Sequence, residues 1–186
     1  MARAITTTEV PTVWTIGHST RTQEEFFGLL DEYRIEAIAD VRRFPGSRRY
    51  PYFASEALAE SLPAHGIAYQ WLPELGGRRK VQPGSPNTGW RNASFQGYAD
   101  HLASPEFAQG LKKLLKLAAT RRTALMCAEA VWWRCHRSLI ADVLKLRGIE
   151  VVHIIDAKHT AVHPYTSAAR IVDGQLSYAP AQAGLL

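Results

Sequence analysis

The chain has 186 residues, of which 46% are hydrophobic and 21% charged, and it carries a net charge of +5. This composition suits one domain of about 100–200 residues and excludes a disordered or fibrous chain. No apolar run reaches the length of a membrane helix, and we expect no signal peptide because the first residues contain no apolar segment. Cys127 and Cys135 are too few for a disulfide framework, so we expect a reduced, cytoplasmic location.

The first part of the chain alternates strand and helix patterns. A β-favouring run ends at Gly17, and a capping box formed by Thr22 and Glu25 precedes apolar residues at helical spacing. A second helix begins at Ser55 and ends before Gly66. Strands are predicted at 13–16, 38–41 and 68–72, and helices at 22–33 and 55–65.

Residues 73–92 are rich in Gly, Pro, Asn and Arg and are expected to form a long loop. Helices are predicted at 95–102, 104–119 and 135–147, strands at 124–127 and 151–155, and a terminal hairpin at 171–176. The alternation predicts an α/β fold with a mostly parallel β-sheet flanked by helices, a Rossmann-like three-layer arrangement with a C-terminal β-hairpin. We expect a single domain at 13–180, with flexible ends at 1–12 and 181–186.

Unusual polar residues follow the predicted strands. In parallel sheets the site lies outside the carboxyl ends of the strands, so these residues are expected to meet at one edge. Asp40 and Glu129 each follow a strand, and two carboxylates in one cleft can divide into an acid or base and an ionised partner. The alternative is that they pair with arginines and only tie loops together. His136 could carry protons or act as an ordinary hydrogen-bonded side chain.

The positive charge is concentrated in one third of the chain. Residues 41–92 hold eight Arg or Lys and three Glu, so this stretch accounts for the whole net charge of +5. Guanidinium groups grip phosphates with two hydrogen bonds, and aromatic side chains between them can stack on bases. The segment predicts a polyanionic partner, although a solvated basic face is the alternative. Of the adjacent Trp132 and Trp133, at least one is expected to be exposed.

The two cysteines allow a different chemistry. Cys135 lies near a predicted helix start, where free amides can lower the pKa of a thiol. It could instead be a small buried residue, and Cys127 lies in an apolar run that favours the core. Neither the cysteine spacing nor the irregular spacing of His153, His159 and His163 matches a metal-binding motif, so we expect no metal ion and no other cofactor.

Several motifs together resemble the domain of unknown function 488 family, over about Val13 to Tyr178. They are Thr15-Ile-Gly-His18-Ser-Thr20, Asp40-Val-Arg42, Leu75-Gly-Gly-Arg78, Phe95-x-x-Tyr98-Ala, Cys127-Ala-Glu129 and Cys135-His-Arg137. Members of that family are often labelled as DNA repair proteins, so the resemblance implies action on DNA. The family's recurring polar positions correspond here to His18, Asp40, Arg42, Arg78, Tyr98, Glu129, Cys135, His136 and Arg137.

A weaker similarity links the chain to rhodanese-like domains. Asp40-Val-Arg42 follows a strand, and a later strand ends at Cys127, as in that layout. The similarity implies sulfur transfer by a thiolate. A rhodanese loop is short, however, whereas here eight residues separate Cys127 from His136.

The leading hypothesis is an enzyme that hydrolyses a glycosidic or phosphodiester bond in damaged or modified DNA. The expected catalytic residues are Asp40, Glu129, His136 and Cys135. The expected nucleic-acid-binding residues are His18, Arg42, Arg43, Arg48, Arg78, Arg79, Tyr98, Trp132, Trp133 and Arg137. The alternatives are a thiol-dependent enzyme, either a rhodanese-like sulfurtransferase or a redox protein, and a non-catalytic nucleic-acid-binding module.

Overall fold

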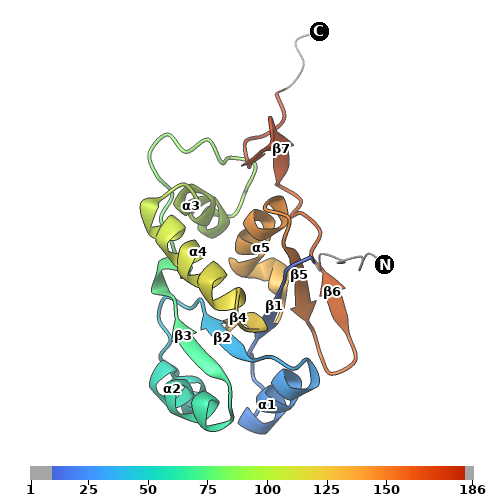
Figure 1. The fold of residues 1–186 in the computed structure, drawn as a ribbon. Coiled ribbons are helices and arrows are strands. Elements are labelled where there is room, and N and C mark those ends of the chain that lie inside the picture. Colours follow the sequence, from blue (N-terminus) through green and yellow to red (C-terminus); the bar gives the residue numbers. More distant parts are fainter. Residues whose placement is uncertain (1–9, 183–186) are drawn as a thin grey trace, which may run out of the picture.

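Six strands form the main sheet of the computed structural model, which describes residues 10–182. They are β1 (Thr12–Gly17), β2 (Ala37–Asp40), β3 (Ala68–Trp71), β4 (Thr123–Cys127), β5 (Glu150–Ile154) and β6 (Thr160–Val162). Their order across the sheet is β3-β2-β4-β1-β5-β6 (Figure 1). The first five strands are parallel, and β6 pairs antiparallel with β5 at the edge.

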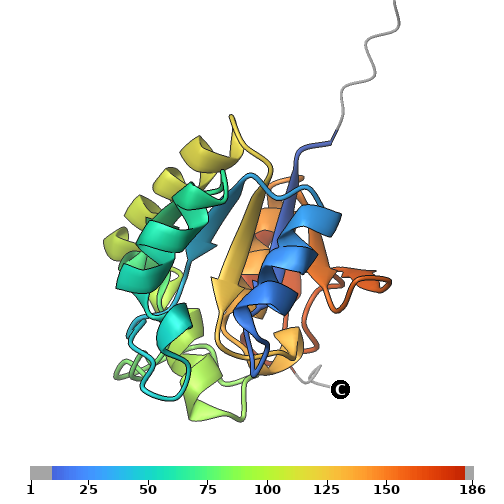
Figure 2. The ribbon, with the colours of Figure 1, turned by 90° about the horizontal axis from the view of Figure 1, so that it is seen from below.

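Helices cover both faces of this sheet (Figures 1 and 2). They are α1 (Gln23–Glu32), α2 (Ser55–Ala64), α3 (Ala93–His101), α4 (Pro105–Ala118) and α5 (Arg137–Leu146). Apolar residues of α1 and α2 pack on one face, whereas those of α3, α4 and α5 pack on the other. Neighbouring residues of β4 face opposite sides, Leu125 and Cys127 toward α4 and α5, Ala124 and Met126 toward α1 and α2.

Local sequence signals explain where most helices begin. The capping box of Thr22 and Glu25 is formed at the start of α1. Asn92 caps α3, and Ser104 caps α4 ahead of a proline at the first helical position. Helix α5 starts at Arg137, two residues later than expected, because residues 132–134 form a separate short 3₁₀ turn.

The predicted fold class is confirmed, as one mostly parallel α/β domain with a C-terminal hairpin. The hairpin consists of β7 (Arg170–Val172) and β8 (Gln175–Ser177), and Asp173 and Gly174 at its turn both have positive φ. The predicted flexible ends at 1–12 and 181–186 lie mostly outside the described residues. No helix within residues 10–182 is long and apolar enough to cross a membrane.

The loops at the carboxyl ends of β1, β2 and β4 are drawn together in space. His18 N–H and Ser19 N–H donate to the carbonyls of Cys127 and Ala128, so the segment after β1 lies against the segment after β4. A Cβ on Gly17 would lie 2.0 Å from the carbonyl oxygen of Glu129. Only glycine permits this close approach, which brings the loop that follows β4 over the end of the sheet.

Candidate active site

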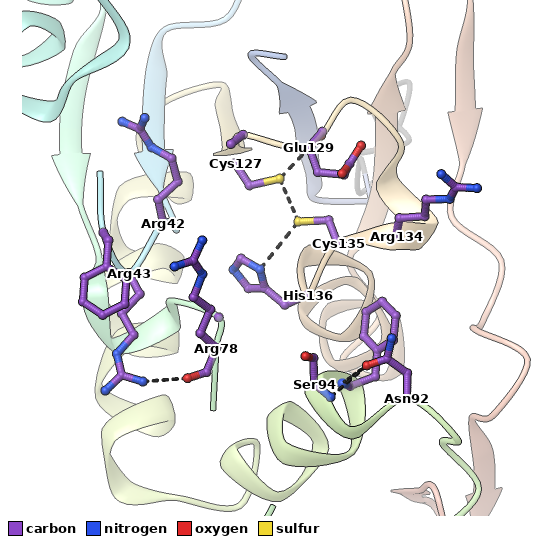
Figure 3. Close-up of a pocket in the computed structure, with 14 residues that line it drawn as sticks. Arg42, Arg43, Arg78, Asn92, Ser94, Cys127, Glu129, Arg134, Cys135 and His136 are labelled. Carbon is purple, nitrogen blue, oxygen red and sulfur yellow. Dashed lines mark hydrogen bonds between the residues drawn. The ribbon is translucent and has the colours of Figure 1, made fainter. Parts of the chain in front are cut away.

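A pocket of about 370 Å³ lies at the carboxyl ends of β2 and β4 (Figure 3). Four segments line it, namely 42–44 after β2, 77–78 in the loop after β3, 92–95 at the start of α3, and 127–136 between β4 and α5. The sheet edge predicted from the sequence therefore does carry a cavity. It combines four arginines with one carboxylate, two thiols and a histidine, and its charged members are Arg42, Arg43, Arg78, Arg134 and Glu129.

The two cysteines meet in this pocket (Figure 3). Cys127 Sγ and Cys135 Sγ are 2.7 Å apart, and both side chains are free thiols. They are 2% and 6% exposed, so they are buried in the core cluster and still line the cavity. The expectation that Cys127 belongs to the core is thus confirmed, but its position beside Cys135 was not anticipated.

His136 is oriented as a base toward Cys135. Its Nε2 lies 2.8 Å from the carbonyl oxygen of Val41, which can only accept, so Nε2 carries the proton. Nδ1 is then an acceptor in the neutral ring, and it lies 3.5 Å from Cys135 Sγ. Burial lowers the pKa of His136, which keeps the ring neutral near pH 7. A Cβ on Gly77 would lie 2.8 Å from this Nδ1, so glycine leaves room for the ring.

The two thiols differ in their tendency to ionise. Burial alone would raise the pKa of Cys135, but the hydrogen bond from Cys127, the charge of Arg137 and a hydrogen bond from the Arg137 backbone outweigh it. The pKa of Cys135 is therefore lowered. Burial and the hydrogen bond to Cys135 raise the pKa of Cys127. These opposite directions favour Cys135 as the thiol that ionises and Cys127 as the donor of the hydrogen bond between them.

Arg137 is a buried cation next to this thiol pair. Its side chain is 1% exposed, and Nη2 donates to the carbonyls of Glu129 at 2.9 Å and Ala130 at 3.0 Å. Nε and Nη1 have no hydrogen-bond partner, and no carboxylate of residues 10–182 forms an ion pair with the group. An uncompensated buried charge is costly, so a thiolate on Cys135 would be stabilised here. Arg137, which was predicted to bind nucleic acid, does not line the pocket.

Asp40 does not share the cavity with Glu129. It is 0% exposed, and its two oxygens accept from Arg42 Nε and Nη2, at 2.8 and 2.7 Å, and from Tyr69 OH at 2.6 Å. Glu129 is exposed and lines the pocket. The structure therefore does not bring the two predicted carboxylates together. Asp40 instead forms a buried ion pair with Arg42, as the alternative interpretation expects.

Arg43, Arg78 and Arg134 supply the accessible positive charge of the pocket. Arg43 donates one N–H to the carbonyl of Arg78, 2.8 Å away, and both guanidinium groups lie over the ring of Phe44. Arg78 has a φ of 58°, a left-handed conformation that is strained for a residue with a side chain. Such strain clusters at ligand-binding positions.

The other predicted nucleic-acid-binding residues lie away from the pocket lining. Buried His18 stacks on Phe53, and burial lowers its pKa to about 4. Tyr98 is 0% exposed and donates to the carbonyl of Leu75. Arg48 is exposed and forms no side-chain hydrogen bond with residues 10–182. Arg79 pairs with Glu106 and donates to backbone carbonyls, so its guanidinium is already engaged.

The tryptophans face different surroundings. Trp133 is 57% exposed, which confirms that at least one of the two is on the surface. Trp132 stacks on His153 with ring centroids 4.2 Å apart, so it anchors the loop rather than facing the cavity. His153 belongs to a buried chain of hydrogen bonds that runs from Thr15 through His153 and His163 to Asp142.

The sequence reasoning missed several lining residues. Asn92 and Ser94 stand at the first turn of α3, whose amino end faces the pocket (Figure 3). Asn is a frequent helix cap, so the sequence could have predicted a helix start at Asn92. No local pattern shows that this helix start faces the loop after β4. Arg134 could not be distinguished from other exposed arginines. Within residues 10–182 no group of three or more His, Cys, Asp or Glu side chains is placed to hold a metal ion.

A family model described as "Domain of unknown function DUF488" matches residues 22–144, which is more than half of the chain. No curated protein and no solved structure matches.

Proposed function

This chain belongs to the DUF488 family, and we propose that it is a thiol-dependent oxidoreductase that uses Cys135 and Cys127 as a dithiol. One observation carries the proposal. Two free thiols lie 2.7 Å apart in the pocket, and the neutral Nδ1 of His136 is directed at one of them. A nucleophile, a base and a group that orients the base (here the carbonyl of Val41) form the arrangement expected for an activated nucleophile.

The proposed reaction transfers two electrons from the dithiol to the substrate. The Cys135 thiol gives its proton to His136, and the thiolate attacks the electrophilic sulfur of a substrate disulfide, so one substrate thiolate leaves with the electron pair of the broken bond. The proton on His136 passes to this leaving thiolate. Cys127 then attacks Cys135 Sγ and its proton goes to the second substrate thiolate, which leaves as a thiol while a Cys127–Cys135 disulfide forms. A dithiol reductant restores the starting state.

The surroundings of the thiols favour a negatively charged substrate. Arg43, Arg78 and Arg134 face the same cavity as Cys135, and Glu129 is the carboxylate among its lining residues. The first turn of α3 adds the partial positive charge of a helix start. Positively charged side chains therefore surround the cavity that contains the reacting thiols.

Hydrolysis of DNA by paired carboxylates has less support than thiol chemistry. Asp40 has no exposed surface and its oxygens are bonded to Arg42 and Tyr69, so of the predicted pair Glu129 alone faces the pocket. Sulfur transfer requires one reactive thiol, and the second thiol beside Cys135 is what favours the redox reaction. Nucleic acid as the bound partner is a separate question from the reaction.

The stoichiometry of a disulfide reaction tests this proposal. The anionic disulfide dithiobis(nitrobenzoate) is mixed with the reduced protein, and released thionitrobenzoate is counted. The wild-type protein should release two equivalents in linked steps and end as an internal disulfide. Cys127→Ser should release one equivalent and stop as a mixed disulfide at Cys135.

Cys135→Ser is the matched control, because it leaves the less acidic thiol alone. It should react much more slowly than Cys127→Ser at neutral pH. Equal rates for the two single-cysteine variants, or a wild-type protein that ends with two separate mixed disulfides, would contradict the proposal. Circular dichroism spectra of the variants show whether the fold is intact.

A further inference from the structure

We propose that the pocket and a second hollow beside it bind a single strand of nucleic acid, with a base on Phe44 and phosphates on either side of Arg43 and Arg78. This inference rests on the proposed function only in taking this pocket as the site. It specifies the class of the bound molecule, which the thiol chemistry leaves open.

The second hollow, of about 410 Å³, adjoins the pocket. Arg43 and Arg78 line both cavities, and the second also includes Lys80. Its acidic residues are engaged, since Glu106 pairs with Arg79 and Asp100 accepts from the loop residues 82, 85 and 87. A ligand that fills both hollows must be elongated and must carry negative charge on both sides of Arg43 and Arg78, which line both cavities.

The cations available to such a ligand can be identified from their contacts. Arg42 forms an ion pair with Asp40, so its charge is not available to a ligand. Within residues 10–182 the side chains of Arg78, Lys80 and Arg134 form no ion pair and no hydrogen bond, and only one nitrogen of Arg43 donates. These groups lie along the two hollows, as contacts to successive phosphates would require.

Phe44 distinguishes a nucleic acid from a simple polyanion. Its ring is 65% exposed although it lies in the pocket wall. The guanidinium carbons of Arg43 and Arg78 lie 5.5 and 5.8 Å from the centre of the ring. A base that displaces the two guanidinium groups from over this exposed ring can stack on it while the arginines hold its phosphates.

The exposed ring of Phe44 favours a single strand over a duplex. A base in a duplex is stacked and paired, so its face is not available to a protein ring, whereas an unpaired base can leave its neighbours and stack. Figure 3 shows the guanidinium group of Arg78 on the side of the cavity opposite Cys135 and His136, whereas that of Arg42 points away from the thiols. A strand bound along Arg43 and Arg78 would thus present one nucleotide to the thiols.

Fluorescence anisotropy with labelled oligothymidylates of two to eight nucleotides tests the inference on the reduced wild-type protein. We expect binding that weakens with salt, with a slope in log–log coordinates of about −0.7 per neutralised phosphate. Arg78→Gln should flatten that slope by about 0.7. Phe44→Ala should weaken binding roughly fivefold or more, since base stacking on an aromatic ring is worth at least about that factor, and Phe44→Tyr should restore it.

Arg121→Gln is the control for charge, because Arg121 is exposed and precedes β4 at the opposite end of the sheet. It should leave the affinity unchanged. The inference is overturned if a duplex or thymidine monophosphate binds as tightly as the oligothymidylate, if Phe44→Ala has no effect, or if no oligothymidylate binds. Anisotropy reports strand binding and thionitrobenzoate release reports the thiol chemistry, so a failure of the thiol chemistry and a failure of strand binding are separate results.

Discussion

Replacing Cys127 with alanine tests how the structure makes Cys135 acidic. The replacement removes the thiol that hydrogen-bonds Cys135 Sγ from 2.7 Å. A hydrogen bond to a charged group contributes about 1.5–3 kcal/mol, and one pKa unit corresponds to about 1.36 kcal/mol. The pKa of Cys135 should therefore rise by about 1–2 units. Serine at the same position keeps a donor of similar size, so Cys127→Ser should leave the pKa of Cys135 lower than Cys127→Ala does.

The pH dependence of the iodoacetamide reaction measures this pKa directly. Each variant has a single cysteine, because the chain contains only two, so the midpoint of the rate profile belongs to Cys135. Burial affects the maximal rate, whereas the midpoint reports ionisation. The reasoning is refuted if the alanine and serine variants share one midpoint near the ordinary thiol value of about 8.5.

Three other perturbations address the surroundings of the thiols. Gly77→Ala, with both cysteines retained, would place a Cβ 2.8 Å from Nδ1 of His136 and should slow alkylation of the thiols at pH 7. Gly46→Ala, whose Cβ would meet open space, should leave the alkylation rate unchanged. His18 has a folded-state pKa of about 4, below its unfolded value of about 6.5, so it contributes stability above pH 6.5 that is lost as the pH falls. Urea unfolding should show that the free energy of unfolding falls by about 3 kcal/mol less between pH 7 and pH 4 in His18→Phe than in the wild type. Equal decreases in the two proteins would contradict this. Asp40→Asn weakens a buried ion pair and should cost up to about 3–5 kcal/mol of unfolding free energy, whereas Glu129→Gln at an exposed carboxylate should cost little, and comparable costs would refute the structural role of Asp40.

The fold could be predicted from the sequence because its signals are local. Capping residues, apolar spacing and the turn at Asp173 and Gly174 each specify an element without reference to the rest of the chain. β6 was missed because it has three residues and none of them is buried, so no core pattern marks it in the sequence. Helix α5 begins later than expected because residues 132–134 form a 3₁₀ turn and Cys135 after it is extended.

The site could be located but not assembled from the sequence. The rule that polar residues gather at the carboxyl ends of parallel strands selected Arg78 and Glu129, which line the pocket, and also His18 and Asp40, which do not. The role of Asp40 depends on Tyr69, a contact between neighbouring strands that no local pattern reveals. The contact of the two thiols depends on how residues 128–134 fold back.

The ultraviolet absorbance of the thiolate, followed during a pH titration of the reduced wild-type protein, tests the central claim most directly. The account predicts that one thiolate appears at a pH below the ordinary cysteine pKa of about 8.5. The second thiol should ionise only at a pH well above that value. The same early signal should vanish in Cys135→Ser. A wild-type protein in which neither thiol ionises below pH 8.5 would contradict the account.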